Sequence, residues 1–134
     1  MSLKSTNPTN TKAWGKLKIH FDKIKNEHMT NWFSNNSERA SDLSFKWDDF
    51  FLDYSKNRLT TETISLLKEL TEEIELSDSI SKYFNGTKIN QTEKRAVMHT
   101  ALRAPKKHNI LLDGKNITSD IFLVKEKVRK FSQA

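Results

Sequence analysis

Apolar side chains recur along most of this chain at intervals of three and four residues, the spacing that places them on one face of a helix. The first stripe consists of Trp14, Leu17, Phe21 and Ile24. Thr9 or Thr11 is available to cap its start. A shorter set then predicts another helical turn and a closing loop, formed by Met29, Trp32, Phe33 and the polar run Asn35-Asn36-Ser37. Ser37 is placed to start a further short helix.

Three further stripes lie beyond residue 59. The first helix begins near Thr60 or Thr61, has Glu62 in its first turn, and buries Ile64, Leu67, Leu70 or Thr71, and Ile74. The next is capped by Ser77, contains Ile80, Tyr83 and Phe84, and ends at the turn Asn85-Gly86. The last begins near Thr118, after an Asp113-Gly114 turn, and places Ile121, Val124, Val128 and Phe131 on one face.

The period changes to two in "LSFKWDDFFLDYS", residues 43–55. Leu43, Phe45 and Trp47 alternate with polar residues, Asp48-Asp49 is typical of a turn, and the following residues are rich in aromatic strand formers. The segment predicts a β-hairpin. An isolated hairpin is only marginally stable in water, so its aromatic side is expected to pack on helices or to join a larger sheet.

The stretch "QTEKRAVMHTALRAP", residues 91–105, predicts one helix. Asn90 and Glu93 have the spacing of a capping box, and Pro105 marks where the helix has already ended. Such a helix would align Arg95, His99 and Arg103 as a cationic stripe. The stripe either binds an anion, because arginine offers planar donors to phosphate, or packs its stems on apolar surface and pairs with acids elsewhere. We favour the structural role.

Composition supports a modest core. Hydrophobic residues make up 35% and charged residues 30% of 134 residues, with a mean hydropathy of −0.73. The helical stripes and the hairpin pattern together predict an α+β fold class, mainly helical with one β-hairpin. The length predicts a single unit over residues 1–134, in which residues 1–8 are flexible. So low a fraction of hydrophobic residues indicates either a small core or dependence on a partner.

The net charge is +6, and the basic residues are dispersed rather than clustered, apart from short groups such as Lys106-Lys107-His108. We expect a solvated surface rather than a nucleic-acid site. Cysteine is absent, which excludes thiolate chemistry and fits a reducing compartment. No apolar run approaches the roughly 20 residues needed to span a bilayer, so a cytoplasmic protein without membrane partners is expected.

Candidate catalytic groups are few. Three dispersed glycines form no phosphate loop, and His20, His28, His99 and His108 lack metal-ligand spacing with a neighbouring acid. We predict no metal and no cofactor. Asp53 is either a general base or a carboxylate that stabilises the turn after the second strand, and the turn role is favoured because Tyr54-Ser55-Lys56-Asn57 follows directly.

Three ordered motifs resemble a known family. "LDYSKNRLTTET", "FNGTKINQTEKRAVMHTALRAP" and "ILLDGKNI" closely resemble the N-terminal part of the glucose-6-phosphate isomerase (phosphoglucose isomerase) family. The leading segment "NPTNTKAWGKLKIHFDKIK" is similar to the family's first helix. The resemblance covers nearly the whole chain and implies the N-terminal helical segment of a larger α/β enzyme of the sugar-isomerase type.

The resemblance implies interconversion of glucose 6-phosphate and fructose 6-phosphate through ring opening and a cis-enediol. The family's Glu base, its ring-opening His and Lys, its Arg and its Ser/Thr phosphate loop lie C-terminal to the matched region. This chain is therefore expected to contain no catalytic, substrate-binding or metal-binding residue and to be inactive alone. Its expected partners are the remaining domains, in a homodimer that binds the sugar phosphate. The alternative is a small basic module that binds a polyanion or nucleic acid through Arg95, Arg103 and Lys106-Lys107.

Overall fold

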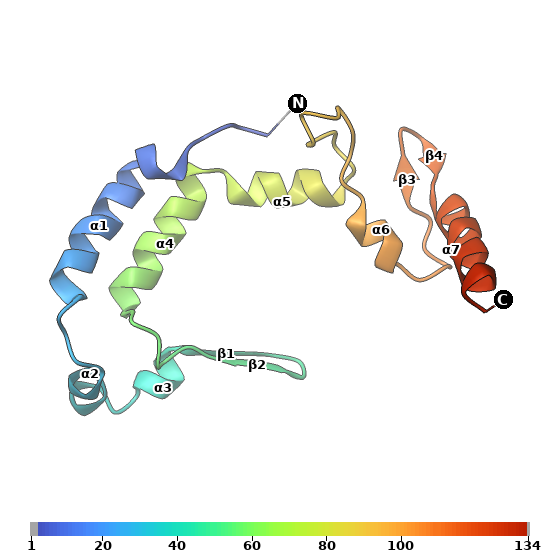
Figure 1. The fold of residues 1–134 in the computed structure, drawn as a ribbon. Coiled ribbons are helices and arrows are strands. Elements are labelled where there is room, and N and C mark those ends of the chain that lie inside the picture. The colour runs from blue at the N-terminus through green and yellow to red at the C-terminus, as the bar shows by residue number, and fades with distance from the viewer. Residues whose placement is uncertain (1–2, 134) are drawn as a thin grey trace. The chain divides into compact units, whose positions relative to one another are not determined.

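A computed structural model describes residues 3–133, which divide into two compact units. The N-terminal unit is residues 5–76, and the C-terminal unit is residues 77–133 together with residues 3 and 4. Both are drawn in Figure 1. Residues 1 and 2 of the predicted flexible stretch 1–8 lie outside the described residues, and that prediction stays open. That residues 1–134 form a single domain also stays a prediction.

The elements of the N-terminal unit follow the predicted order closely. They are η1 (Pro8–Asn10), α1 (Lys12–Ile24), α2 (Met29–Asn35), α3 (Arg39–Asp42), β1 (Ser44–Trp47), β2 (Phe50–Asp53) and α4 (Thr61–Glu73). Of the two predicted caps for α1, Thr11 is the one used: its hydroxyl accepts from the Trp14 N–H. The antiparallel β1–β2 hairpin confirms the change of period, and the fold class is confirmed as mainly helical α+β.

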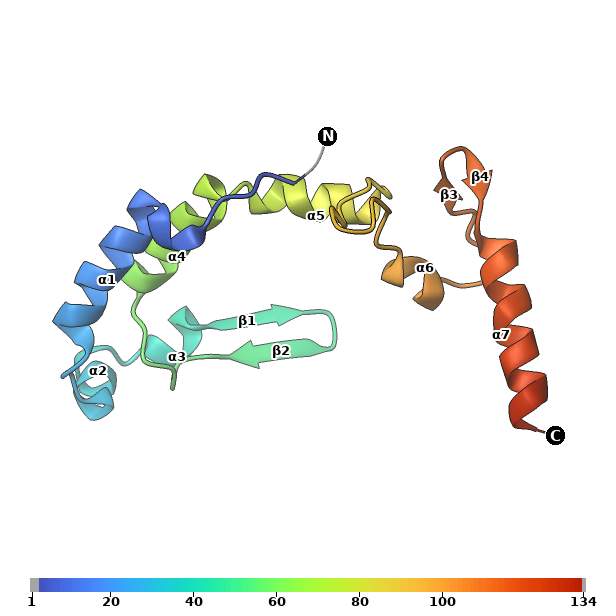
Figure 2. The ribbon, with the colours of Figure 1, turned by 45° about the horizontal axis from the view of Figure 1, so that its top comes forward.

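Polar contacts at both ends join α1 and α4 in an antiparallel pair, side by side in Figures 1 and 2. At one end, the Glu73 carboxylate accepts from the backbone N–H groups of Lys12 and Ala13 at 2.9 and 2.8 Å. A carboxylate is favoured there because these N–H groups have no partner within the helix. At the other end, His20 Nε2 lies 2.7 Å from the Thr63 hydroxyl, which also accepts from Thr60 N–H in the capping box of α4.

These end contacts set a different buried face from the predicted one. On α1 the residues buried against α4 are Ala13 and His20, whereas Trp14 and Phe21 of the predicted stripe are exposed. On α4 the buried residue is Leu66, not Leu67. Spacing alone permits either face, but small Ala13 allows a close approach. The bonds of His20 and Glu73 then fix the rotation of the helices.

Arg39 is the buried centre of the loops between α2 and α4. Its side chain is almost fully enclosed, and its guanidinium donates to the carbonyls of Ser55 (2.9 Å), Asn57 (3.1 Å) and Leu59 (2.9 Å). The same group lies 4.9 Å from the ring centroid of Trp32 in α2. The charge is therefore satisfied by carbonyl dipoles and a ring face.

We expect Arg39→Ala to lower the free energy of unfolding of the N-terminal unit by about 2–4 kcal/mol, because it leaves buried carbonyls without a donor. Urea unfolding followed by tryptophan fluorescence measures this unit alone, since all three tryptophans, Trp14, Trp32 and Trp47, lie within it. The matched control is Arg58→Ala, which removes an exposed bond to the Lys25 carbonyl. Equal losses in the two variants would contradict the role of Arg39.

The C-terminal unit contains α5 and the elements that follow. They are α5 (Leu76–Phe84, which begins at the boundary), α6 (His99–Arg103), β3 (Leu111–Leu112), β4 (Lys115–Asn116) and α7 (Thr118–Ser132). Asn85-Gly86 ends α5 as predicted, with Gly86 at φ +77°. The Asp113-Gly114 turn, with both residues at positive φ, closes a second short hairpin. The start of α7 at Thr118 is confirmed.

The single helix predicted over residues 91–105 is wrong in its first half. Asn90 and Glu93 do bond reciprocally, at 3.1 Å (Glu93 N–H to Asn90 Oδ1) and 2.8 Å (Asn90 Nδ2 to Glu93 Oε2). They close a tight turn, however, in which Asn90 and Arg95 form a bridge and Lys94 has φ +52°. The same side-chain bonds satisfy a helix start or a loop, so the capping pattern did not discriminate. Only residues 99–103 are helical.

Gly86 is required by both conformation and packing. At its φ of +77° an L side chain is strained, and an added Cβ would lie 3.1 Å from Leu112 Cδ1. Gly114 has nearly the same φ, +76°, with nothing within 4 Å of an added Cβ. Alanine substitutions at Gly114 and Gly86 therefore distinguish the effect of backbone strain alone from the effect of strain together with crowding.

We expect Gly114→Ala to destabilise the C-terminal unit by about 1 kcal/mol through backbone strain, and Gly86→Ala by about 2 kcal/mol or more through strain and overpacking. Denaturation of both variants followed by circular dichroism measures the difference. If Gly114→Ala were the more harmful of the two, the crowding at Gly86 would be refuted.

Candidate functional site

The predicted cationic stripe of Arg95, His99 and Arg103 is not assembled on one helix, because α6 contains His99 and Arg103 but not Arg95. Arg95 belongs to the bridge with Asn90, and its Nη2 pairs with Glu93 Oε2 at 2.6 Å. His99 is the first residue of α6, and Arg103 Nη1 donates to the His99 carbonyl at 3.4 Å. All three side chains are exposed. The structural role favoured over anion binding thus takes the form of local pairing.

Arg95 and His99 do line one cavity of about 450 Å³ within the C-terminal unit. Its wall is otherwise mainly apolar, with Val97, Leu112 and Ile121 among its residues. An anion site needs several donors that converge on one point. The single arginine here is already paired with Glu93, so this cavity is better suited to apolar groups than to phosphate.

Asp53 stabilises the turn after β2, which confirms the favoured interpretation. Its Oδ1 accepts the Ser55 N–H at 2.8 Å, and the Ser55 side chain is itself fully buried beneath it. Hydrogen bonds from the Ser55 hydroxyl and backbone hold the pKa of Asp53 below its usual value of 3.8. A general base in catalysis needs a pKa nearer the working pH, so this shift is in the wrong direction for one.

The four histidines are not brought together as metal ligands. His20 is buried between α1 and α4, with Nδ1 3.3 Å from the Glu62 carboxylate. His28 precedes α2 and bonds the Thr30 hydroxyl at 2.8 Å. Within residues 3–133 no group of three or more His, Asp or Glu side chains is placed to hold a metal ion.

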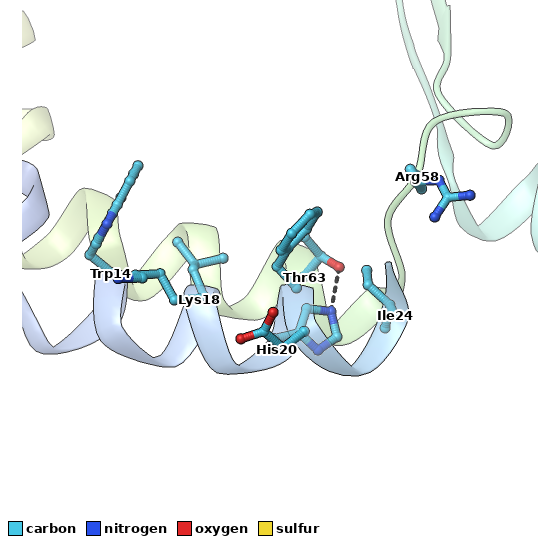
Figure 3. Close-up of a pocket in the computed structure, with 9 residues that line it drawn as sticks. Trp14, Lys18, His20, Ile24, Arg58 and Thr63 are labelled. Carbon is cyan, nitrogen blue, oxygen red and sulfur yellow. Dashed lines mark hydrogen bonds between the residues drawn. The ribbon is translucent and has the colours of Figure 1, made fainter. Parts of the chain in front are cut away.

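An apolar groove of about 540 Å³ runs along the face of α1 that α4 leaves uncovered. Figure 3 shows Trp14, Lys18 and Ile24 on α1, with Thr63 and Arg58 contributed by α4 and the preceding loop. The exposed aromatic rings of Trp14 and Phe21 form its wall. The sequence analysis placed both rings on one apolar helical face but did not predict the groove, because periodicity does not show whether such a face is covered.

Arg39 was also missed, and Thr118 was predicted only as the start of a helix, although the contacts of both residues organise the fold. Thr118 donates to the His108 carbonyl at 2.7 Å and accepts from Ile110 N–H at 3.1 Å, which ties the start of α7 to the segment that precedes β3. Both residues act through backbone groups 8 to 20 positions away in sequence, so no local motif marks these contacts. In the described part of the chain no helix is long and apolar enough to cross a membrane.

The fold and these contacts define a mainly helical α+β module in which Arg95, Asp53 and Arg39 are each held by internal contacts. Comparison with known proteins gives its family. A sequence model described as "Phosphoglucose isomerase" matches residues 53–134. Glucose-6-phosphate isomerase of Christiangramia forsetii is 49% identical over 130 residues, which are 97% of this chain. The chain therefore belongs to the phosphoglucose isomerase family, and it spans 24% of the length of that curated relative.

The lowered pKa of Asp53 predicts that its contribution to folding stability depends on pH. A carboxylate whose folded pKa lies below the unfolded value contributes stability above about pH 3.8, and this contribution is lost as the pH falls through the folded pKa. We expect Asp53→Asn to lower the unfolding midpoint at pH 7 and the difference from the parent protein to shrink steadily below pH 3.8.

Urea midpoints measured between pH 2.5 and 7 provide the test, with the exposed turn residue Asp49→Asn as the matched control. The control difference is expected to stay small throughout. A difference for Asp53→Asn that grows on acidification would reverse the sign and refute the assignment.

Proposed function

We propose that this chain is the N-terminal scaffold portion of a glucose-6-phosphate isomerase, the enzyme that interconverts glucose 6-phosphate and fructose 6-phosphate. The observation that supports this most strongly is 49% identity along 97% of the chain to a relative four times its length. The family match begins at Asp53, inside the first of the three motifs, and continues through the other two.

The scaffold role means that the chain contains no catalytic residue of its own. Three contacts support it. Arg95 is paired with Glu93, Asp53 is committed to Ser55, and the buried Arg39 is committed to backbone carbonyls. A group already held in this way is poorly placed to move a proton on a sugar carbon. The substrate, the remaining domains and a second subunit of a homodimer are accordingly assigned to the intact enzyme, and cytoplasmic location follows the same proposal.

The alternative, a small basic module for polyanions, has less support. It required Arg95 and Arg103 on one helical face, and they are not on one helix. Lys106 is directed over the ring of Phe122, 6.0 Å from its centroid, rather than grouped with those arginines. No specific arrangement of basic residues within 3–133 favours this second function.

The direct test is an isomerase assay that couples glucose 6-phosphate production to a dehydrogenase. The purified chain alone is expected to give no turnover above buffer, and the complete isomerase polypeptide that contains it is expected to be active. The complete polypeptide with Arg103→Gln is expected to keep kcat within about twofold, because this exposed side chain bonds only its own helix.

The outcomes separate the two parts of the proposal. Turnover by the pure chain would overturn its scaffold role while leaving the reaction in place. Failure of the complete polypeptide to convert the sugar phosphate would overturn the reaction itself. A loss of 100-fold or more in kcat for Arg103→Gln, with the protein folded, would place this arginine in the catalytic machinery.

A further inference from the structure

The β1–β2 hairpin has one face made wholly of large apolar side chains. Its register pairs Phe45 with Leu52 and Trp47 with Phe50, and directly paired residues lie on the same side of a sheet. The four side chains are 46–72% exposed. We call this set, Phe45, Trp47, Phe50 and Leu52, the hairpin apolar face.

The opposite face is different in character. It pairs Ser44 with Asp53 and Lys46 with Phe51, so three of its four residues are polar or charged. A hairpin with one polar and one apolar side has the pattern of a sheet that is covered on one side only. Two strands alone are only marginally stable in water. Aromatic rings left exposed to water lower the stability of the hairpin further.

The base of the hairpin is held firmly, so its apolar face is presented in a defined direction. Tyr54 N–H donates to the Leu43 carbonyl at 2.9 Å, directly beyond the last strand pair. The Ser55 carbonyl that follows accepts from the buried Arg39. Figures 1 and 2 both show the two strands running out from α3 beyond these contacts. A pre-organised surface loses little entropy when it is covered.

We propose that the hairpin apolar face docks on the part of the isomerase polypeptide that lies beyond residue 134 of this sequence. The proposal rests on the proposed function, which gives the complete polypeptide about four times this length. The occupant is expected to present an apolar surface to the aromatic rings of this face.

The size of the face favours a tethered occupant over a separate molecule. Four side chains of this kind, roughly half exposed, present on the order of 400–500 Å² of apolar surface. A stable interface between separate proteins buries about 800 Å² on each partner. A covalently linked domain has a high effective concentration and loses less translational freedom, so a smaller patch is sufficient to hold it.

Photo-crosslinking in the complete, active polypeptide tests this directly. Phe45 lies on the hairpin apolar face and Phe51 on the opposite face, and both are more than half exposed in the chain. Each is replaced in turn by p-benzoylphenylalanine, and the crosslinked peptides are identified by mass spectrometry. The residue at position 45 is expected to crosslink within one polypeptide to a peptide beyond residue 134, at least fivefold more than the residue at position 51.

Three results would overturn the docking proposal: a crosslink between two polypeptides, which would indicate a second copy; a crosslink confined to residues 3–133; or equal crosslinking from both positions. Isomerase activity is measured on the same samples. Active protein without the expected crosslink refutes the docking alone, whereas a folded but inactive parent polypeptide refutes the proposed function independently.

A second measurement covers the case in which the position 45 derivative does not accumulate. In the complete polypeptide, Trp47→Ser is expected to lower the Tm by several degrees more than Phe51→Ser, because only the first removes a ring buried by docking. In the chain alone the two variants are expected to differ little. Equal shifts in the complete polypeptide would refute the proposal.

Discussion

The N-terminal unit depends on the enclosure of one positive charge. Arg39 is held among the carbonyls of Ser55, Asn57 and Leu59, and those bonds decide where the loop between β2 and α4 lies. The position of that loop sets the base of the hairpin and the start of α4. An arginine suits this place because its planar group presents several donors in fixed directions. A lysine could not reach all three carbonyls with one ammonium.

Polar contacts also decide how α1 and α4 meet. Apolar packing is not directional, so an amphipathic helix with rings on two neighbouring faces has more than one acceptable rotation. Glu73 at one end and His20 at the other select the rotation that buries Ala13 and leaves Trp14 and Phe21 outside. The exposed groove on α1 is therefore a consequence of the end contacts.

Exposed apolar surface recurs in both units. The hairpin apolar face, the rings beside α1, and Val124, Val128 and Phe131 on α7 are all exposed. Patches of this size on a soluble protein usually mark contacts with other protein surface. This agrees with a chain that spans 24% of the length of an isomerase relative, and with the small core indicated by its composition.

The amino-acid sequence by itself determined the elements whose signals are local. These are the starts of α1 near Thr9 or Thr11 and of α4 near Thr60 or Thr61, the Asp48-Asp49 hairpin, the turns at Gly86 and Gly114, and the role of Asp53. All of them depend on neighbours within a few residues. Its motifs also indicated the family. Tertiary structure alone decided the rotation of α1 and the roles of Arg39 and Thr118. In each of these cases local energies allow two arrangements, and the choice is made by hydrogen bonds or packing between residues that only folding brings together.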